Sequence, residues 1–234
     1  MNEIVLVPAW RRPEFLWAAL ERIWLARSGE DITVRVCIDR GYSPDVLWAA
    51  HEFSSYVGDG RLEIRQRDEH RYRGNSYNVL EAYRGAALEG YDLVHLVEED
   101  VFVGRDYFEF HRDAHALVPD AFSVSACRNQ QFNVADDPAY DEAAIYSHDS
   151  YQSLGVSFRS DVLADAVAGV GPEYHRDMIA YCRRTFPRSL IPRGNAEQDG
   201  LMHRKQEELG LKTVYASAPR AYHAGFVGYH RRGV

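Results

Sequence analysis

Leu93-Val94-His95-Leu96-Val97-Glu98-Glu99-Asp100 is a short apolar run that ends in three consecutive acids. A run of this length is typical of a strand buried within a parallel sheet. Open sheets with helices on both faces bind their ligands at the carboxyl ends of the strands, so these acids lie where a ligand site is expected. The stretch therefore predicts an α/β protein with an acidic site at the edge of its sheet.

The residues before this stretch alternate short apolar runs with amphipathic segments, which indicates helices covering both faces of a mostly parallel sheet. We expect strands at residues 4–7, 32–38, 62–64 and 93–97. The intervening helices are expected to begin at Pro13, at Ser43-Pro44 and after Arg73-Gly74, because proline and glycine commonly mark helix starts and turns. The order is therefore strand and helix in strict alternation up to the acids.

The second half of the chain is less regular. We expect a helix from about Asp106, a strand at 122–126, a helix at 197–209 and a strand at 212–215. Residues 128–153 show no clear periodicity, and an irregular segment of that length is typical of a functional loop. No repeat and no Pro/Ser-rich linker divides the sequence, so we expect one domain over residues 1–234.

Composition and charge exclude several classes of protein. The 234 residues carry a net charge of −8, which disfavours a general binder of nucleic acids or anionic membranes. No apolar run approaches the about 20 residues that a membrane-spanning helix needs. Three scattered cysteines without a C-x-x-C pair argue against a disulfide framework or a thiolate zinc site. The first residues lack the pattern of a secretory signal, and we expect a cytoplasmic protein.

The acidic triplet itself suggests a cation site. Successive strand residues point to opposite faces, so Glu98 and Asp100 are expected to converge on one cation while Glu99 points away or bonds to the backbone. Oxygen ligands favour Mg²⁺ or Mn²⁺ over softer metals. The alternative is that the acids cap the following turn or pair with arginines, and the spacing alone leaves both interpretations open.

The wider pattern resembles the GT-A glycosyltransferases. The run at 93–101 with Asp106-Tyr107-Phe108 is similar to their acidic DXD-type strand and following helix, including the E-D-D of the N-acetylglucosaminyltransferase I group. Residues 7–13 resemble their first strand and turn, and 197–223 resemble the family-2 order of acidic pair, helix, glycine, strand and histidine. The resemblance covers most of the chain, although Arg128 to Phe186 matches only loosely. It implies an α/β GT-A-like fold with a mixed, mostly parallel central sheet flanked by helices.

The resemblance also implies that the two halves of the domain bind different substrates. Residues 1–103 are expected to bind a nucleoside-diphosphate sugar, most simply a UDP-sugar, and residues 104–234 are expected to bind the acceptor. Asp39 stands where the family places a carboxylate against the nucleotide base, and Asn78 belongs near the sugar diphosphate. A glycine-flanked C-terminal tail is expected to close as a lid over the diphosphate. The expected donor-binding residues are Pro8, Ala9, Trp10, Arg11, Asp39, Gly74, Asn78, Glu98, Glu99, Arg231 and Arg232.

Catalytic and metal-binding roles follow from the same resemblance. Transfer leaves charge on a departing diphosphate, which a divalent cation neutralises. The expected ligands of Mn²⁺ or Mg²⁺ are Asp100, Glu98 and His223. Asp199 is the expected general base, which takes the proton from an acceptor hydroxyl as the anomeric centre inverts. Gln198 separates Glu197 from Asp199 where the family has an acidic pair, so either acid can hold the catalytic position.

The acceptor is open at this stage, since a glycan, a small molecule or a hydroxylated base in nucleic acid would all present a hydroxyl. The arginines at 183, 184, 188 and 193 would suit an acceptor that bears phosphate, although a solvated arginine face has the same composition. Three other functions compete with sugar transfer. One is a non-catalytic sugar-nucleotide-binding module. The second is a nucleotidyltransferase of related fold, which is expected to carry a glycine-rich loop where Pro8 to Pro13 has no glycine. The third is a metal-dependent hydrolase, which would cleave the donor rapidly without any acceptor.

Overall fold

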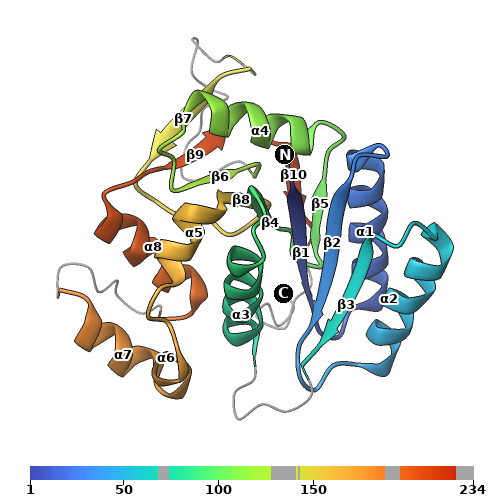
Figure 1. Ribbon diagram of the computed structural model, residues 1–234, viewed down its shortest axis with the longest axis horizontal. Coiled ribbons are helices and arrows are strands. Elements are labelled where there is room, and N and C mark those ends of the chain that lie inside the picture. Colours follow the sequence, from blue (N-terminus) through green and yellow to red (C-terminus); the bar gives the residue numbers. More distant parts are fainter. Residues whose placement is uncertain (68–73, 128–140, 142, 188–195, 225–234) are drawn as a thin grey trace, which may run out of the picture.

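The computed structural model describes residues 1–67, 74–127, 141, 143–187 and 196–224 (Figure 1). Within these residues the chain forms an eight-stranded sheet of order β3-β2-β1-β4-β8-β6-β9-β7 and a separate two-stranded sheet, β10-β5. The large sheet is mixed, because β1 to β4 are mutually parallel while β8 runs antiparallel to both of its neighbours. In the described part of the chain no helix is long and apolar enough to cross a membrane.

The predicted alternation of strands and helices is confirmed in the first half. Pro13 and Pro44 each occupy the first turn of a helix, and Gly58 ends the second helix in the left-handed conformation, with φ of 63°. The elements in order are β1 (Glu3–Ala9), α1 (Pro13–Arg27), β2 (Ile32–Ile38), α2 (Pro44–Val57), β3 (Leu62–Gln66), α3 (Asn75–Leu88) and β4 (Leu93–Leu96).

The second half contains more regular structure than the sequence indicated. The expected irregular segment at 128–153 includes an edge strand, β7, because the backbone of residues 145–148 pairs with β9. The remaining elements are β5 (Val101–Val103), α4 (Tyr107–Leu117), β6 (Ser123–Ser125), β7 (Ile145–His148), β8 (Val156–Arg159), α5 (Ser160–Val167), α6 (Pro172–Arg176), α7 (Met178–Thr185), α8 (Gln198–Leu209), β9 (Thr213–Ala216) and β10 (Ala221–His223). Residues 128–140 lie outside the described residues.

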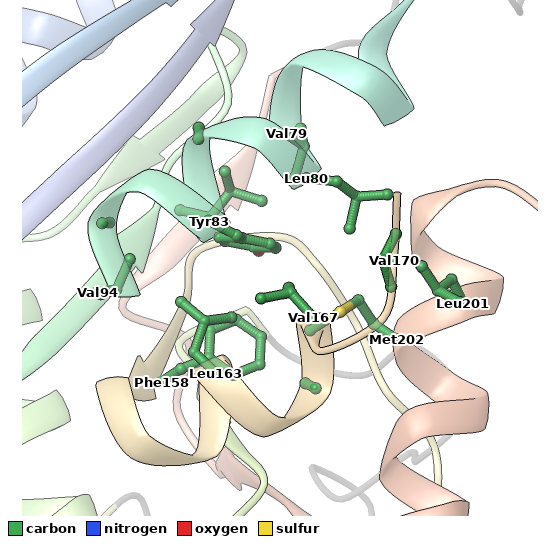
Figure 2. Close-up of a cluster of buried hydrophobic side chains, with 14 of the residues drawn as sticks. Val79, Leu80, Tyr83, Val94, Phe158, Leu163, Val167, Val170, Leu201 and Met202 are labelled. Atoms are coloured by element: carbon green, nitrogen blue, oxygen red, sulfur yellow. The ribbon is translucent and has the colours of Figure 1, made fainter. Parts of the chain in front are cut away.

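Helices cover both faces of the large sheet. Ile4 and Leu6 of β1 belong to one core with α3, α5 and α8, whereas Val5 and Val7 belong to a second core with α1, α2 and the start of α4. Figure 2 shows part of the first core, where side chains from α3, α5 and α8 meet over β4 and β8. Successive residues of β1 are therefore buried on opposite faces of the sheet, so both faces of its centre are covered.

Candidate functional site

The carboxyl ends of three central strands meet at one edge of the sheet. Asp39 N–H donates to Ala9 O at 3.0 Å, and Val97 N–H donates to Leu6 O at 3.0 Å, so the segments that follow β1, β2 and β4 lie side by side. The acidic triplet is one of these segments. It forms a turn rather than a continuation of the strand, because Val101 N–H donates to Glu98 O at 2.9 Å.

Arg12, at the start of α1, binds two acids of the triplet. Its Nε donates to Glu99 Oε1 at 2.8 Å and its Nη1 donates to Asp100 Oδ2 at 2.8 Å. Trp10 N–H also donates to Glu99 Oε2, at 3.0 Å. A bond from Glu99 to the backbone was one of the two expectations for this residue. Both pairing with an arginine and bonding to the backbone therefore occur within the triplet.

Glu98 points away from this arginine and lines a cavity of about 370 Å³. Asn75 Nδ2, in the first turn of α3, lies 3.4 Å from Glu98 Oε1. Burial raises the pKa of Glu98 to about 8, and the charges of Asp199 and Asp100 add to the rise. The cavity is lined by Asn75, Glu98, Tyr151, Gln152, Ser153, Leu154, Glu197, Gln198 and Asp199.

Asp199 enters the same cavity from the first turn of α8. Burial raises the pKa of Asp199, a hydrogen bond from Ser153 opposes the rise, and the charge of Glu197 adds to it. Its Oδ1 atom is buried without a hydrogen-bond partner among the described residues. Glu197, directly before the helix, is exposed. The structure thus brings the two predicted catalytic acids to the cavity that also holds Glu98.

Asp100, the last acid of the triplet, also pairs with His223. His223, on β10, places Nε2 at 3.2 Å from Asp100 Oδ2, and β10 is held there by its pairing with β5. Two ligand atoms at right angles on an octahedral Mg²⁺ are about 3 Å apart, so this separation suits a shared divalent ion. Asp100 Oδ1 is buried and has no partner in the described part of the chain.

These donors fit a divalent cation in chemistry, since an oxygen and an imidazole nitrogen are within its usual ligands. The set is incomplete as it stands. Among the described residues, no group of three or more His, Cys, Asp or Glu side chains is placed to hold a metal ion. Glu98 lies in the cavity rather than beside His223, and Arg12 occupies one oxygen of Asp100.

Several of the predicted nucleotide-binding residues lie beside the acidic triplet. Pro8 and Ala9 end β1 in buried positions, Trp10 is half-buried, and the Arg11 guanidinium lies 4.2 Å from the centre of the Trp10 ring. Asp39 is buried and accepts from Gly74 N–H at 3.0 Å, which joins the end of β2 to the start of α3. These residues form a wall beside the triplet.

Asn78 has a different environment from the one expected near a sugar diphosphate. It is 1% exposed, and its Nδ2 donates to Cys37 O at 2.6 Å. It therefore ties α3 to β2 from inside the core. Arg231 and Arg232, together with Arg188 and Arg193, lie outside the described residues. Arg184 is exposed on α7 and pairs with Glu173 at 2.7 Å.

Sequence reasoning did not assign a role to four residues that shape the site. Arg12 holds two of the acids, and Ser153 supports Asp199. Ser76 Oγ donates to Gln198 Oε1 at 2.6 Å and accepts from Gln198 N–H at 3.2 Å. The role of Arg12 could have been inferred from its position before Pro13, shortly after a strand, because the three acids follow a neighbouring strand. The roles of the other three residues depend on contacts between segments distant in sequence.

The geometry of this site and sheet defines a class of protein. The chain has a GT-A-like glycosyltransferase fold, in which a mixed, mostly parallel sheet flanked by helices carries acids at its central edge. A comparison with protein-family models finds no match, and the sequence matches no curated protein.

Two solved structures are similar to this chain in fold. The chain is similar to the mannosyltransferase PcManGT from Pyrobaculum calidifontis, solved in complex with GDP-Man and Mn²⁺, with a TM-score of 0.62, 15% identity, and coverage of 98% of this chain and 59% of that one. It is also similar to TarS of S. aureus, with a TM-score of 0.53, 14% identity, and coverage of 96% and 60%. This chain therefore spans less than two thirds of the length of both proteins.

Proposed function

We propose that this protein is a metal-dependent glycosyltransferase that moves a sugar from a nucleoside-diphosphate sugar to an acceptor hydroxyl with inversion at the anomeric carbon. One observation carries the proposal. On this fold, Glu98 from the end of β4 and Asp199 from the start of α8 line one cavity, although they come from opposite halves of the sequence. Carboxylates that are clustered and partly desolvated are typical of sites for proton transfer and cation binding.

Residues 1–103 would supply the donor side. Trp10, Arg11 and Asp39 would lie along the nucleotide, and Gly74 directly precedes α3 where its N–H donates to Asp39. PcManGT was solved with GDP-Man and Mn²⁺, which supports a nucleotide-sugar donor without selecting the nucleoside. Asp100 and His223, with Glu98 nearby, would hold Mn²⁺ or Mg²⁺. A bound divalent ion supplies charge neutralisation to a departing diphosphate.

Residues 104–234 would supply the base and the acceptor side. Asp199 is the proposed base because its raised pKa makes it a stronger proton acceptor than an ordinary aspartate, and its buried Oδ1 has no hydrogen-bond partner among the described residues. Ser153 holds the carboxylate in place. The lid expected to carry Arg231 and Arg232 lies outside the described residues, and its role stays a prediction.

The test compares two neighbouring amide substitutions, Asp199→Asn and Glu197→Gln. Release of nucleoside diphosphate is measured for GDP-Man and a panel of UDP-sugars with Mn²⁺ or Mg²⁺, in the presence of glycan, small-molecule and hydroxylated-nucleic-acid acceptors. Asp199→Asn should lower turnover by about 100- to 10,000-fold, the usual contribution of a general base, with nucleotide binding retained. Glu197→Gln is the matched control and should stay close to the wild type.

Three results would contradict the proposal. Nucleotide binding by the wild type without turnover of any donor would favour a binding module. Rapid donor cleavage that no acceptor accelerates would favour a hydrolase. Equal turnover in Asp199→Asn and the wild type would remove Asp199 from the reaction, and a loss confined to Glu197→Gln would give the base role to that residue.

A further inference from the structure

Arg12 places a positive charge on the carboxylate that the proposed function assigns to a metal ion. Its side chain is 25% exposed, while the side chain of Asp100 is 8% exposed. The contact between Arg12 Nη1 and Asp100 Oδ2, at 2.8 Å, is a charge-assisted hydrogen bond of ordinary length. The oxygen that accepts it is also the oxygen nearest to His223 Nε2, at 3.2 Å. Arg12 therefore binds the atom that lies nearest the other proposed metal ligand.

The guanidinium uses separate nitrogens for its two acids. Nε donates to Glu99 Oε1 and Nη1 donates to Asp100 Oδ2, both at 2.8 Å. The bond to Asp100 can break without loss of the bond to Glu99. Glu99 is held a second time by Trp10 N–H, so its position does not depend on Asp100. The bridge is thus built so that one acid can be released alone.

The side chain of Arg12 has room to change its position. Arg12 directly precedes Pro13 at the start of α1, where its carbonyl accepts from Leu16 N–H at 3.0 Å, and the described ring contact of its side chain is Phe15, 5.4 Å away. A quarter of the side chain is already in contact with solvent. Release of Asp100 therefore moves a partly hydrated group rather than a buried one, which keeps the cost of the movement low.

We propose that Arg12 is a built-in counter-cation that competes with a divalent ion for Asp100. Its guanidinium neutralises Asp100 while no ion is bound, and its positive charge and its hydrogen bond to Oδ2 oppose coordination of an ion by that oxygen together with His223. This inference rests on the proposed metal site. It assigns to Arg12 a control of metal affinity that is separate from sugar transfer. The intrinsic affinity of the site for a divalent ion is therefore higher than the affinity that the wild type displays.

The experiment measures Mn²⁺ binding directly by electron paramagnetic resonance, in which free Mn²⁺ loses its sharp signal on binding. Arg12→Gln removes the competitor and should tighten Mn²⁺ binding by roughly 10- to 100-fold, the range that one hydrogen bond to a charged group accounts for. Arg11→Gln is the matched control, because it removes the same charge from the same turn. Arg11 bonds to Gly41 O and contacts none of the three acids in the described structure, so its loss should change the affinity by less than about twofold.

Two further variants keep the result interpretable. Arg12→Lys retains a charge near Glu99 but lacks the planar fork that donates to the two acids from separate nitrogens, so it should tighten binding in part and serves if Arg12→Gln fails to fold. Arg12→Gln combined with Asp100→Asn should lose the tight binding. The melting temperature of each variant with and without Mn²⁺ checks folding, and the gain on adding Mn²⁺ should be larger for Arg12→Gln than for the wild type.

The outcomes separate this inference from the function on which it rests. Equal Mn²⁺ affinity in the wild type, Arg12→Gln and Arg12→Lys, lost in each case with Asp100→Asn, would overturn the competition while leaving the metal site intact. Equal tightening by Arg11→Gln and Arg12→Gln would attribute the effect to net charge and would also overturn it. Absence of binding that depends on Asp100 in every variant would remove the metal site itself.

Discussion

His115→Gln should reduce the loss of stability that the protein undergoes in mild acid. His115 lies on α4, is 5% exposed, and places Nε2 at 2.9 Å from Ser157 Oγ on β8. The pKa of His115 is lowered to about 4, mainly by burial and in addition by the neighbouring charges of His95 and Arg159. A hydrogen bond at Ser157 and the charge of Asp161 oppose the shift. The native state therefore holds this imidazole neutral well below the pH at which the unfolded chain protonates it.

The sign and the size of the effect follow from linkage. A histidine whose pKa is lowered on folding stabilises the protein fully above its unfolded pKa, near 6.5, and that stability falls as the unfolded state takes up a proton. For a shift from about 6.5 to about 4, the free energy of unfolding drops by about 2 kcal/mol between about pH 7.5 and about pH 5 from this residue alone. Glutamine keeps a polar group near Ser157 without a titrating one.

Urea unfolding at these two pH values measures the difference. Between these two pH values His115→Gln should lose about 2 kcal/mol less of its free energy of unfolding than the wild type loses, even though it starts from a lower stability at neutral pH. His51→Gln removes an exposed imidazole on α2 and should lose as much as the wild type. Equal losses in His115→Gln and the wild type would refute the assignment of the acid sensitivity to this buried ring.

Two further substitutions test the framework of the site. Gly155→Ala should lower the free energy of unfolding by about 2–4 kcal/mol, because φ is +57° and the new Cβ would lie 2.7 Å from Ala221 Cβ on β10. Gly169→Ala, with φ of +74° and open space around it, should cost only about 1 kcal/mol in the same thermal melts, and equal costs would contradict the packing argument. Asn78→Ala should cost about 2 kcal/mol because it leaves Cys37 O without its donor, and weaker nucleotide binding at unchanged stability would instead favour the ligand role that the sequence suggested.

Local signals in the sequence were sufficient for the first half of the fold. The strands β1 and β2 are mainly apolar runs of seven residues, and β3 is a five-residue strand that follows a glycine turn. The helices α1 and α2 begin at Pro13 and Pro44, and α3 begins directly after Gly74. The missed elements depend on pairing at a distance. β8 is four residues long and becomes a strand between β4 and β6, and β5 and β10 have three residues each and pair only with one another. Such short segments carry too few residues for a period to be visible.

The candidate site was predictable in its chemistry but not in its pairings. The position of the acids after a buried strand followed from the apolar run before them. Alternation of faces did not apply to Glu98, Glu99 and Asp100, because β4 ends at Leu96 and the triplet turns. Glu99 and Asp100 consequently reach the same guanidinium of Arg12. The sequence shows that acids and an arginine occur near these strand ends. Which acid forms an ion pair with the arginine depends on the backbone turn, which the sequence does not reveal.

The extra residue between Glu197 and Asp199 shows how a departure from a family pattern is accommodated. Gln198 is buried, and its two hydrogen bonds with Ser76 fix the first turn of α8 against the first turn of α3. With Gln198 turned toward α3, Glu197 stays exposed at the helix boundary and Asp199 is half-buried in the cavity. Gln198 therefore fixes the turn in which Asp199 is more buried than Glu197, although both acids line the cavity. It also joins the helix that carries the proposed base to the helix that carries Asn75 beside Glu98, so that one contact aligns the two halves of the site.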